Sequence, residues 1–400
     1  RRAAGARLAQ ALRGQVVSRP VRDELLVFGQ PHLDDDVIAD VVDALRSGWL
    51  GRGPRVERFE AVFRDYTGAR HVRALNSCSA GLFLALSVAG IGPGDEVVTT
   101  PLTFAATIHA VEHVGATPVL ADIDPTTLNL DPRCVAAAIT PRTRAILPVH
   151  FAGRPCEMDA LGELARTHDL VVVEDAAHAL GAEYHGRRVG VLSDFTVFSF
   201  QAGKNVTTAD GGMVTTDRSE WADRIGTLSL HGMSDDAWGS FRTPGAPPLA
   251  VAAGFKLAMT DVAAAIGTRQ LVTLDAAQAR RQEIWERYDR ELTALPLAPP
   301  PAPAVGTVHG RHLYTVVLDL DAIGAPRDAI RAALREQGIG TGVHYVPIHL
   351  HPYYRERLGL AVGALPNAER VGERILSLPL AAHLTDDDVS DVVTALLRVL

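Results

Sequence analysis

Lys204, in the stretch FTVFSFQAGKNVTTADGGM over 195–213, has the side chain best suited to covalent chemistry in this sequence. The chain contains only two lysines, Lys204 and Lys256, among its 39 Lys and Arg residues. A guanidinium group does not deprotonate in a protein, whereas a desolvated ammonium group can lose its proton and attack a carbonyl. Lys204 is therefore a candidate covalent nucleophile. The alternative is a surface lysine that has been retained without a role.

Polar or aromatic residues follow three other apolar runs. Small hydroxylic residues over 76–81 begin a predicted helix. The free N–H groups and the positive end of that helix favour binding of a phosphate. The alternative is an ordinary serine N-cap. Phe104 follows the run EVVTT and could stack on a planar ring or pack in the core. Asp175 follows the run LVVVE, and a buried carboxylate there needs a cation, either a protonated ring nitrogen or an arginine.

These features together indicate one cofactor. A phosphate seat, a stacking aromatic, an acid for a ring nitrogen and a lysine for an aldehyde are the features that hold pyridoxal phosphate. Ser199, five residues before Lys204, adds a second hydroxyl for the phosphate. Each signal is weak alone, but their order along the chain makes the combination specific. We therefore expect pyridoxal phosphate to bind here.

Composition narrows the class of protein. A chain of 400 residues with 47% hydrophobic and 22% charged side chains is typical of a globular protein with two domains. No apolar run reaches membrane-spanning length, and a net charge of -8 without a basic stripe argues against nucleic-acid binding. Three scattered cysteines predict neither a disulfide framework nor a thiolate metal site, so we expect a reducing cytoplasm.

Short apolar runs alternate with helical patterns from residue 72 onward. This alternation indicates βαβ units and a mostly parallel sheet with helices on both faces, which is the α/β class. Ligands of such sheets bind at the carboxyl ends of the strands, and the residues named above follow those ends. The predicted strands are 72–76, 96–100, 117–123, 144–150 and 170–174, and the predicted helices are 79–90, 103–113, 132–139 and 157–168.

The sequence divides into three predicted parts. Residues 1–22 form an Arg- and Ala-rich N-terminal extension. We interpret this extension as a frayed helix and not as a secretory signal, because the apolar segment of such a signal is missing. Residues 23–272 form a large α/β domain that begins with an amphipathic helix over 33–48, and residues 273–400 form a smaller α+β domain. In the C-terminal region we predict helices over 259–274, 275–295, 326–337, 367–376 and 385–399, strands over 312–319 and 340–346, and a proline-rich connector over 297–306.

Four segments resemble successive blocks of the sugar aminotransferase family of pyridoxal-phosphate enzymes, also named after the DegT, DnrJ, EryC and StrS proteins. They are EDAAHALGAEYHGRRVG, FSFQAGKNVTTADGGMVTT, GFKLAMTDVAAAIGTRQL and GIGTGVHYVPIHLHPYY. The resemblance covers about residues 22–398, and SGWLGRGP and HYVPIHLHPYYRER are most similar to enzymes that aminate C4 of a nucleotide-linked 4-keto sugar. It implies the aspartate aminotransferase fold and a homodimer with each active site at the subunit interface.

The resemblance also implies a role for each candidate residue. It implies that Lys204 bonds the cofactor aldehyde, Asp175 holds the pyridine nitrogen and Phe104 stacks on the ring. The other implied contacts are His178 beside the phenolic oxygen, Cys78, Ser79 and Ser199 at the phosphate, and His344 at the substrate.

One departure from the family pattern concerns the phosphate. The family usually reads G-Y-K-Y-N-M-T-D where this chain reads GFKLAMTD over 254–261, so Ala258 replaces an asparagine that reaches the neighbouring subunit's phosphate. The same comparison matches Lys256 to a position that is often lysine. A hydrogen bond to a charged group contributes about 1.5 to 3 kcal/mol, which corresponds to roughly ten- to a hundredfold in cofactor affinity unless another donor substitutes.

The expected activity is transamination in two half-reactions. The resemblance implies glutamate or glutamine as the amino donor and a nucleotide-linked keto-deoxy sugar as the acceptor, with no nucleic-acid, membrane or metal partner. One alternative of the same class is amination of a cyclitol or another ketone in antibiotic-type biosynthesis. An alternative of another class is a non-catalytic regulatory or binding protein on the same fold, which Ala258 keeps open. The sequence identifies neither the sugar nor its nucleotide.

Overall fold

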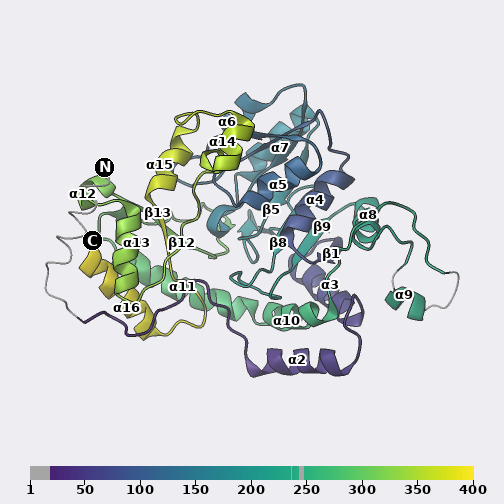
Figure 1. The fold of residues 1–400 in the computed structure, drawn as a ribbon, viewed down its shortest axis with the longest axis horizontal. Coiled ribbons are helices and arrows are strands. Elements are labelled where there is room, and N and C mark those ends of the chain that lie inside the picture. The colour runs from purple at the N-terminus through teal and green to yellow at the C-terminus, as the bar shows by residue number, and fades with distance from the viewer. Residues whose placement is uncertain (1–18, 236, 243–246) are drawn as a thin grey trace.

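A seven-stranded sheet lies at the centre of the computed structural model, which describes residues 19–235, 237–242 and 247–400 (Figure 1). The strand order is β1-β9-β8-β5-β4-β2-β3. Strand β9 is antiparallel to both of its neighbours, and the other pairs are parallel. The predicted α/β class is therefore confirmed. The strands are β1 His71–Leu75, β2 Glu96–Thr99, β3 Thr117–Leu120, β4 Thr143–Leu147, β5 Val171–Asp175, β8 Phe195–Ser199 and β9 Gly212–Thr216.

Successive side chains along each strand enter opposite hydrophobic layers, as the pleat of a strand requires. In β8, Phe195 and Val197 pack towards helix α4, whereas Phe198 packs against Phe63 of α3 with ring centroids 5.1 Å apart. Both faces are covered, which explains why the strands are apolar throughout. One layer contains α4 Cys78–Val88, α5 Ala105–His113 and α8 Ser219–Ser229, and the other contains α3 Pro54–Thr67, α6 Pro132–Ala138 and α7 Met158–His168. The strands and helices predicted over 72–174 are all present.

The N-terminal helix α2, Asp35–Arg46, lies along α10, Asp261–Val272, at the lower edge of Figure 1. Both helices were predicted, whereas α3 was not. Helix α3 begins at Pro54, a residue that suits the first turn of a helix because no N–H is needed there. The buried Asp261 carboxylate accepts hydrogen bonds from the N–H groups of Arg55 and Val56 at 3.1 and 3.0 Å, and so it fixes the start of α3 to α10.

A second hydrophobic core surrounds a three-stranded sheet in the order β10-β12-β13. Ile284 of α11 contributes to this core, and Val21 and Leu26 from the N-terminal segment also pack against it. The domain division at residue 272 stays a prediction, and most of the predicted extension, residues 1–18, lies outside the described residues. The elements of this region are α11 Leu274–Glu291, β10 Leu297–Ala298, β12 Tyr314–Leu318, α13 Arg327–Glu336, β13 Ile375–Leu378 and α16 Asp386–Val399.

The strand predicted over 340–346 was wrong. Ile339 and Gly342 form only isolated bridges, with Leu26 and Ser377 respectively. The segment changes partner because Gly340 brings it against the N-terminal segment, where a Cβ atom would lie 2.7 Å from the Leu26 carbonyl oxygen. Strand β13 was not predicted, although its four residues are apolar or small and pair with β12.

The remaining elements are short. The proline-rich connector contains β10 and then has no regular structure as far as residue 306. No helix within the described ranges is long and apolar enough to cross a membrane. The short elements are η1 Phe151–Gly153, β6 Glu183–Tyr184, β7 Arg187–Arg188, α9 Ala237–Arg242, β11 Thr307–Val308, α12 Leu320–Ile323, η2 Ile348–Leu350, α14 Pro352–Leu358 and α15 Pro366–Arg374.

Candidate active site

Lys204 lies in the loop between β8 and β9, just beyond the carboxyl end of β8. The loop turns tightly there, because the Lys204 N–H donates to the Gln201 carbonyl oxygen at 2.8 Å. Burial lowers the pKa of the Lys204 amine to about 8, although the nearby Asp175 and Cys78 favour its charged form. A lysine with this pKa is partly unprotonated near neutral pH and can act as a nucleophile. The other lysine, Lys256, is exposed.

Asp175 ends β5 and is buried under the first turns of α4 and α5. Its Oδ2 atom accepts a hydrogen bond from the Thr107 hydroxyl at 2.8 Å, and its Oδ1 atom accepts one from the Ala177 N–H at 3.1 Å. Burial raises the pKa of the Asp175 carboxyl, while Thr107, Ala177 and Lys204 oppose this shift. A cation placed against this carboxylate would favour its charged form, which is what a protonated ring nitrogen does.

Glu174, the residue before Asp175, points to the opposite face of the sheet. Its Oε2 atom lies 2.6 Å from Nε2 of His150, and its Oε1 atom accepts hydrogen bonds from Ser193 and Thr196 at 2.6 and 2.8 Å. These bonds satisfy a carboxylate that is fully buried. Of the two adjacent acids, only Asp175 influences Lys204, so only Asp175 belongs to the site.

The phosphate site is predicted at the start of α4. Ser77 is the N-cap, and its side chain accepts a hydrogen bond from the Ala80 N–H, so the serine-cap alternative holds for Ser77. Ser79 is exposed in the first turn, and its hydroxyl has no hydrogen-bond partner among the described residues. Gly212 in β9 approaches the same turn so closely that a Cβ atom would lie 2.6 Å from the Cys78 nitrogen. Ser199 pairs with Gly212 and therefore ends beside this turn.

Cys78 contributes to the site differently from Ser79. Its Sγ atom points beneath the helix, 4.0 Å from Oδ1 of Asp175 and 3.9 Å from the Val197 carbonyl oxygen. Burial raises the pKa of the Cys78 thiol well above its usual value, so the thiol stays protonated. A contact between Cys78 and a phosphate would therefore be made through the main-chain N–H group.

Three histidines lie close enough to Lys204 for its charge to depress their pKa values. Burial is the main cause of lowered pKa values for His178, His312 and His344, with Lys204 contributing to each, and the pKa of His344 falls to about 4. Nδ1 of His344 lies 2.9 Å from the Ser377 hydroxyl, and Nδ1 of His312 lies 3.2 Å from Oδ1 of Asn205. All three rings are neutral at physiological pH, so Lys204 has no cationic neighbour among them.

His178 is central to this group. Its ring lies 4.5 Å from that of His312 between centroids, and its Nε2 atom lies 3.1 Å from the Tyr345 hydroxyl. Phe104 precedes α5 and is 64% exposed, with its ring 6.3 Å from that of Tyr345. An aromatic side chain this exposed beside a buried site is free to stack on a planar ligand.

These residues fit pyridoxal phosphate. The first turn of α4 offers N–H groups and a free serine hydroxyl, which suit a phosphate. Asp175 offers a buried carboxylate, Phe104 an exposed aromatic face and Lys204 an amine with a lowered pKa. The cofactor-contact roles of these residues, and that of His344 towards the substrate, stay predictions.

Several residues near the predicted set were not predicted from the sequence. They come from four segments that are distant in sequence: Thr107 from α5, Asn205 and His312 from two loops, and Tyr345 from the segment after α13. Thr107, Asn205 and Tyr345 lie within three residues of Phe104, Lys204 and His344 respectively, so only adjacency to a candidate signalled them. His312 carried no signal in the sequence.

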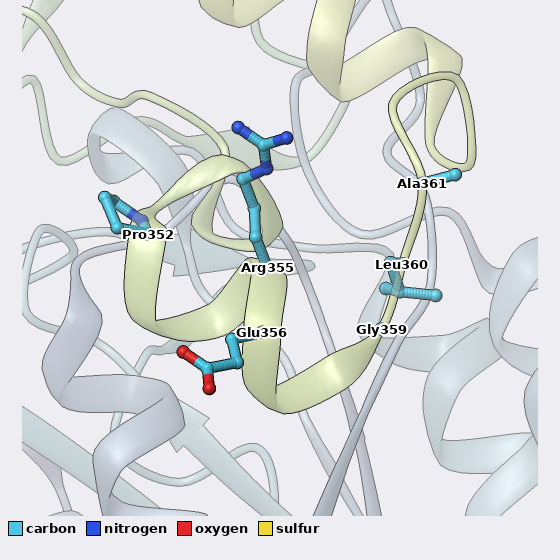
Figure 2. Close-up of a pocket in the computed structure, with 6 residues that line it drawn as sticks. All are labelled: Pro352, Arg355, Glu356, Gly359, Leu360 and Ala361. Carbon is cyan, nitrogen blue, oxygen red and sulfur yellow. The ribbon is translucent and has the colours of Figure 1, made fainter.

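A surface hollow over α14 and the following loop lies outside this group. Figure 2 shows the Arg355 guanidinium and the Glu356 carboxylate pointing in different directions, so they do not converge on a ligand. None of the candidate residues lines it, and we assign it no chemistry. The lining residues are Pro352, Arg355, Glu356, Gly359, Leu360 and Ala361.

A lysine of lowered pKa near a buried carboxylate, at the carboxyl ends of a mostly parallel sheet, is the arrangement typical of pyridoxal-phosphate-dependent enzymes. The sequence profile of the DegT/DnrJ/EryC1/StrS aminotransferase family matches residues 31–397, and the chain belongs to this family. The family resemblance, the enzyme class and the cofactor expected from the sequence are confirmed. The non-catalytic alternative is thereby set aside.

Known proteins are similar to this chain over nearly its whole length. Spore coat polysaccharide biosynthesis protein SpsC of Bacillus subtilis is 46% identical over 376 residues, which are 94% of this chain and 97% of SpsC. Spr1654 of Streptococcus pneumoniae, solved in PLP and PMP forms, is 34% identical with a TM-score of 0.87 for the PMP form, covering 94% of this chain and 100% of Spr1654. DesI, solved in the presence of its TDP-sugar product, is 36% identical with a TM-score of 0.84, covering 97% of this chain and 95% of DesI.

Proposed function

We propose that this enzyme transfers an amino group from glutamate or glutamine to a nucleotide-linked keto-deoxy sugar. The observation that carries the proposal is that Lys204, whose pKa is about 8, lies close enough to the buried carboxylate of Asp175 for that charge to influence its amine. Bound pyridoxal phosphate supplies an electron-withdrawing ring that stabilises negative charge at the carbon losing its proton. Every other requirement of the reaction falls to the residues of this chain.

Lys204 is the residue that we propose moves the proton. A base is most effective when its pKa lies near the working pH, and the lowered pKa of Lys204 meets this condition. Asp175 holds a proton on the cofactor's ring nitrogen, and Thr107 keeps the carboxylate oriented through its 2.8 Å hydrogen bond. Phe104 covers the ring, and Ser79 and Ser199 bind the phosphate.

The acceptor is proposed from two relatives. DesI was solved with a TDP-sugar product, and SpsC is named for polysaccharide biosynthesis. Both names support a sugar acceptor, and the first supports a nucleotide carrier. We assign the substrate contact to His344, because its half-buried ring lies close enough to Lys204 for that charge to lower its pKa and its Nδ1 atom lies 2.9 Å from the Ser377 hydroxyl.

We further propose that the enzyme works as a homodimer in the cytoplasm. Phe104 beside the site and Phe255 near α4 are 64% and 43% exposed, and exposed apolar side chains suit contact with a second subunit. The Phe255 ring packs edge-on against Phe83 at 5.1 Å. All three cysteines are free, as a reducing compartment favours.

The test is a panel of amino donors and carbonyl acceptors read by mass spectrometry. Glutamate, glutamine, aspartate and alanine are each combined with TDP- and UDP-linked 4-keto-6-deoxy sugars and with a cyclitol ketone. We expect an amino-sugar product with glutamate or glutamine and a nucleotide-linked acceptor. Lys204→Arg serves as the inactive control. Product formed only from the cyclitol ketone would refute the proposed substrate class.

A further inference from the structure

Both ring nitrogens of His178 are already engaged within the protein. The Ala152 N–H donates a hydrogen bond to Nδ1 of His178 at 3.2 Å. A main-chain N–H can only donate, so Nδ1 carries a lone pair and the proton of the neutral ring is on Nε2. That Nε2–H lies 3.1 Å from the Tyr345 hydroxyl oxygen and donates to it. His178 therefore has no remaining donor for a bound ligand.

The Tyr345 hydroxyl, in contrast, keeps a hydrogen to donate. Its oxygen accepts the hydrogen bond from His178, and His178 is its only hydrogen-bond partner among the residues that the structure describes. Burial and the Asp175 carboxylate raise the pKa of Tyr345, so the hydroxyl stays protonated. The rings of Tyr345 and His178 are nearly parallel, with a 17° angle between their planes, and the exposed ring of Phe104 lies 6.3 Å from that of Tyr345 between centroids.

We propose that Tyr345, and not His178, donates the hydrogen bond to the phenolic oxygen of pyridoxal phosphate, and that His178 is a positioning residue that fixes the direction of the Tyr345 hydroxyl. The inference rests on the proposed function, because it needs the cofactor to lie between Phe104 and Asp175. A neutral donor held by a second neutral group suits an anionic phenolic oxygen, because no further charge is brought near Lys204.

The experiment combines a substitution of the side chain with a change in the cofactor and measures cofactor affinity for each combination. Apo-enzyme is titrated with pyridoxal phosphate and with 3-deoxypyridoxal phosphate, which lacks the phenolic oxygen. We expect Tyr345→Phe to bind pyridoxal phosphate about ten- to a hundredfold more weakly than wild type, the loss typical of a hydrogen bond to a charged group. The same variant should bind the deoxy analogue as wild type does. Equal losses for both ligands, or no loss, would overturn the proposal.

The positioning role of His178 is tested by asking whether the effects of substituting His178 and Tyr345 on cofactor affinity add. His178→Ala should weaken pyridoxal phosphate binding, and adding it to Tyr345→Phe should cause no further loss, because residues that act through one bond are not additive. A further loss in the double variant would mean that His178 contacts the cofactor directly and would overturn its positioning role. Tyr354→Phe is the matched control, since Tyr354 is buried in α14 and packs on His109.

The wild-type titration distinguishes a failure of the proposed function from a failure of the proposed role of Tyr345. A wild-type protein that takes up no pyridoxal phosphate would refute the proposed function. A wild-type protein that binds pyridoxal phosphate, together with a Tyr345→Phe variant of unchanged affinity for it, would refute only the role of Tyr345.

Discussion

The Thr107 hydroxyl donates a hydrogen bond of 2.8 Å to Oδ2 of Asp175, and this contact joins the first turn of α5 to the end of β5. Asp175 is buried and its carboxyl has a raised pKa, so its orientation depends on the few donors around it. Thr107 and the Ala177 N–H hold one oxygen each. The carboxylate is thereby held in place before any cofactor binds.

The first prediction concerns this carboxylate. Asp175→Asn should retain the cofactor but slow transamination by on the order of a hundredfold or more, because a neutral amide does not keep the ring nitrogen protonated. Thr107→Val should have a smaller effect, since it removes one donor and leaves the charge. Single-turnover kinetics with glutamate measures both variants. Near-normal turnover by Asp175→Asn would show that the carboxylate has no role at the ring nitrogen.

The second prediction concerns the two lysines. Lys204→Arg should lose both transamination and the visible absorbance of lysine-bound cofactor while the fold persists, because arginine keeps the charge and cannot act as a nucleophile. Lys256→Arg is the matched control and should behave as wild type, since Lys256 is exposed. Absorbance spectra, far-ultraviolet circular dichroism and turnover are measured together. Turnover by Lys204→Arg above the background without enzyme would remove Lys204 from this role.

The third prediction is the pH dependence of Lys204 in the apo-enzyme. Its pKa of about 8 lies below the ordinary lysine value of 10.5, so the free amine is populated at lower pH than in a solvated lysine. The rate of modification by an amine reagent should rise with pH and reach half its maximum near pH 8. The Lys256→Arg background leaves Lys204 as the only lysine side chain, and peptide mass spectrometry excludes the N-terminus. A midpoint above pH 10 would contradict the effect of burial.

The fourth prediction concerns Ala258, whose main chain bridges to Leu75 at the end of β1. Ala258→Asn should tighten pyridoxal phosphate binding by about 1.5 to 3 kcal/mol, because the amide gains a hydrogen bond to a phosphate. The gain should occur only in a dimer, since the family comparison has this side chain reach the neighbouring subunit. Titration of the apo-enzyme with the cofactor, together with a measurement of the protein's molecular mass by light scattering, tests both points. Unchanged affinity in a confirmed dimer would mean that the phosphate needs no such donor.

The sequence by itself determined the α/β class and the main contacts expected of the site. Short apolar runs separated by helical patterns can be recognised locally, and in a parallel sheet the residues that follow them meet at one edge. The side chains of Asp175 and Glu174 lie on opposite faces of the sheet, because successive side chains along a strand alternate between its two faces. Lys204 was recognisable because an arginine-rich composition made a retained lysine informative.

Only the tertiary structure decided which residues complete the site. His312 and Tyr345 approach His178 from segments more than a hundred residues away in the chain, and no local periodicity encodes such a meeting. The same limit explains the error over 340–346, where pairing with Leu26 and Ser377 outweighs the strand propensity of the segment. The tautomer of His178 depends on one main-chain N–H, that of Ala152, so it is a property of the folded chain.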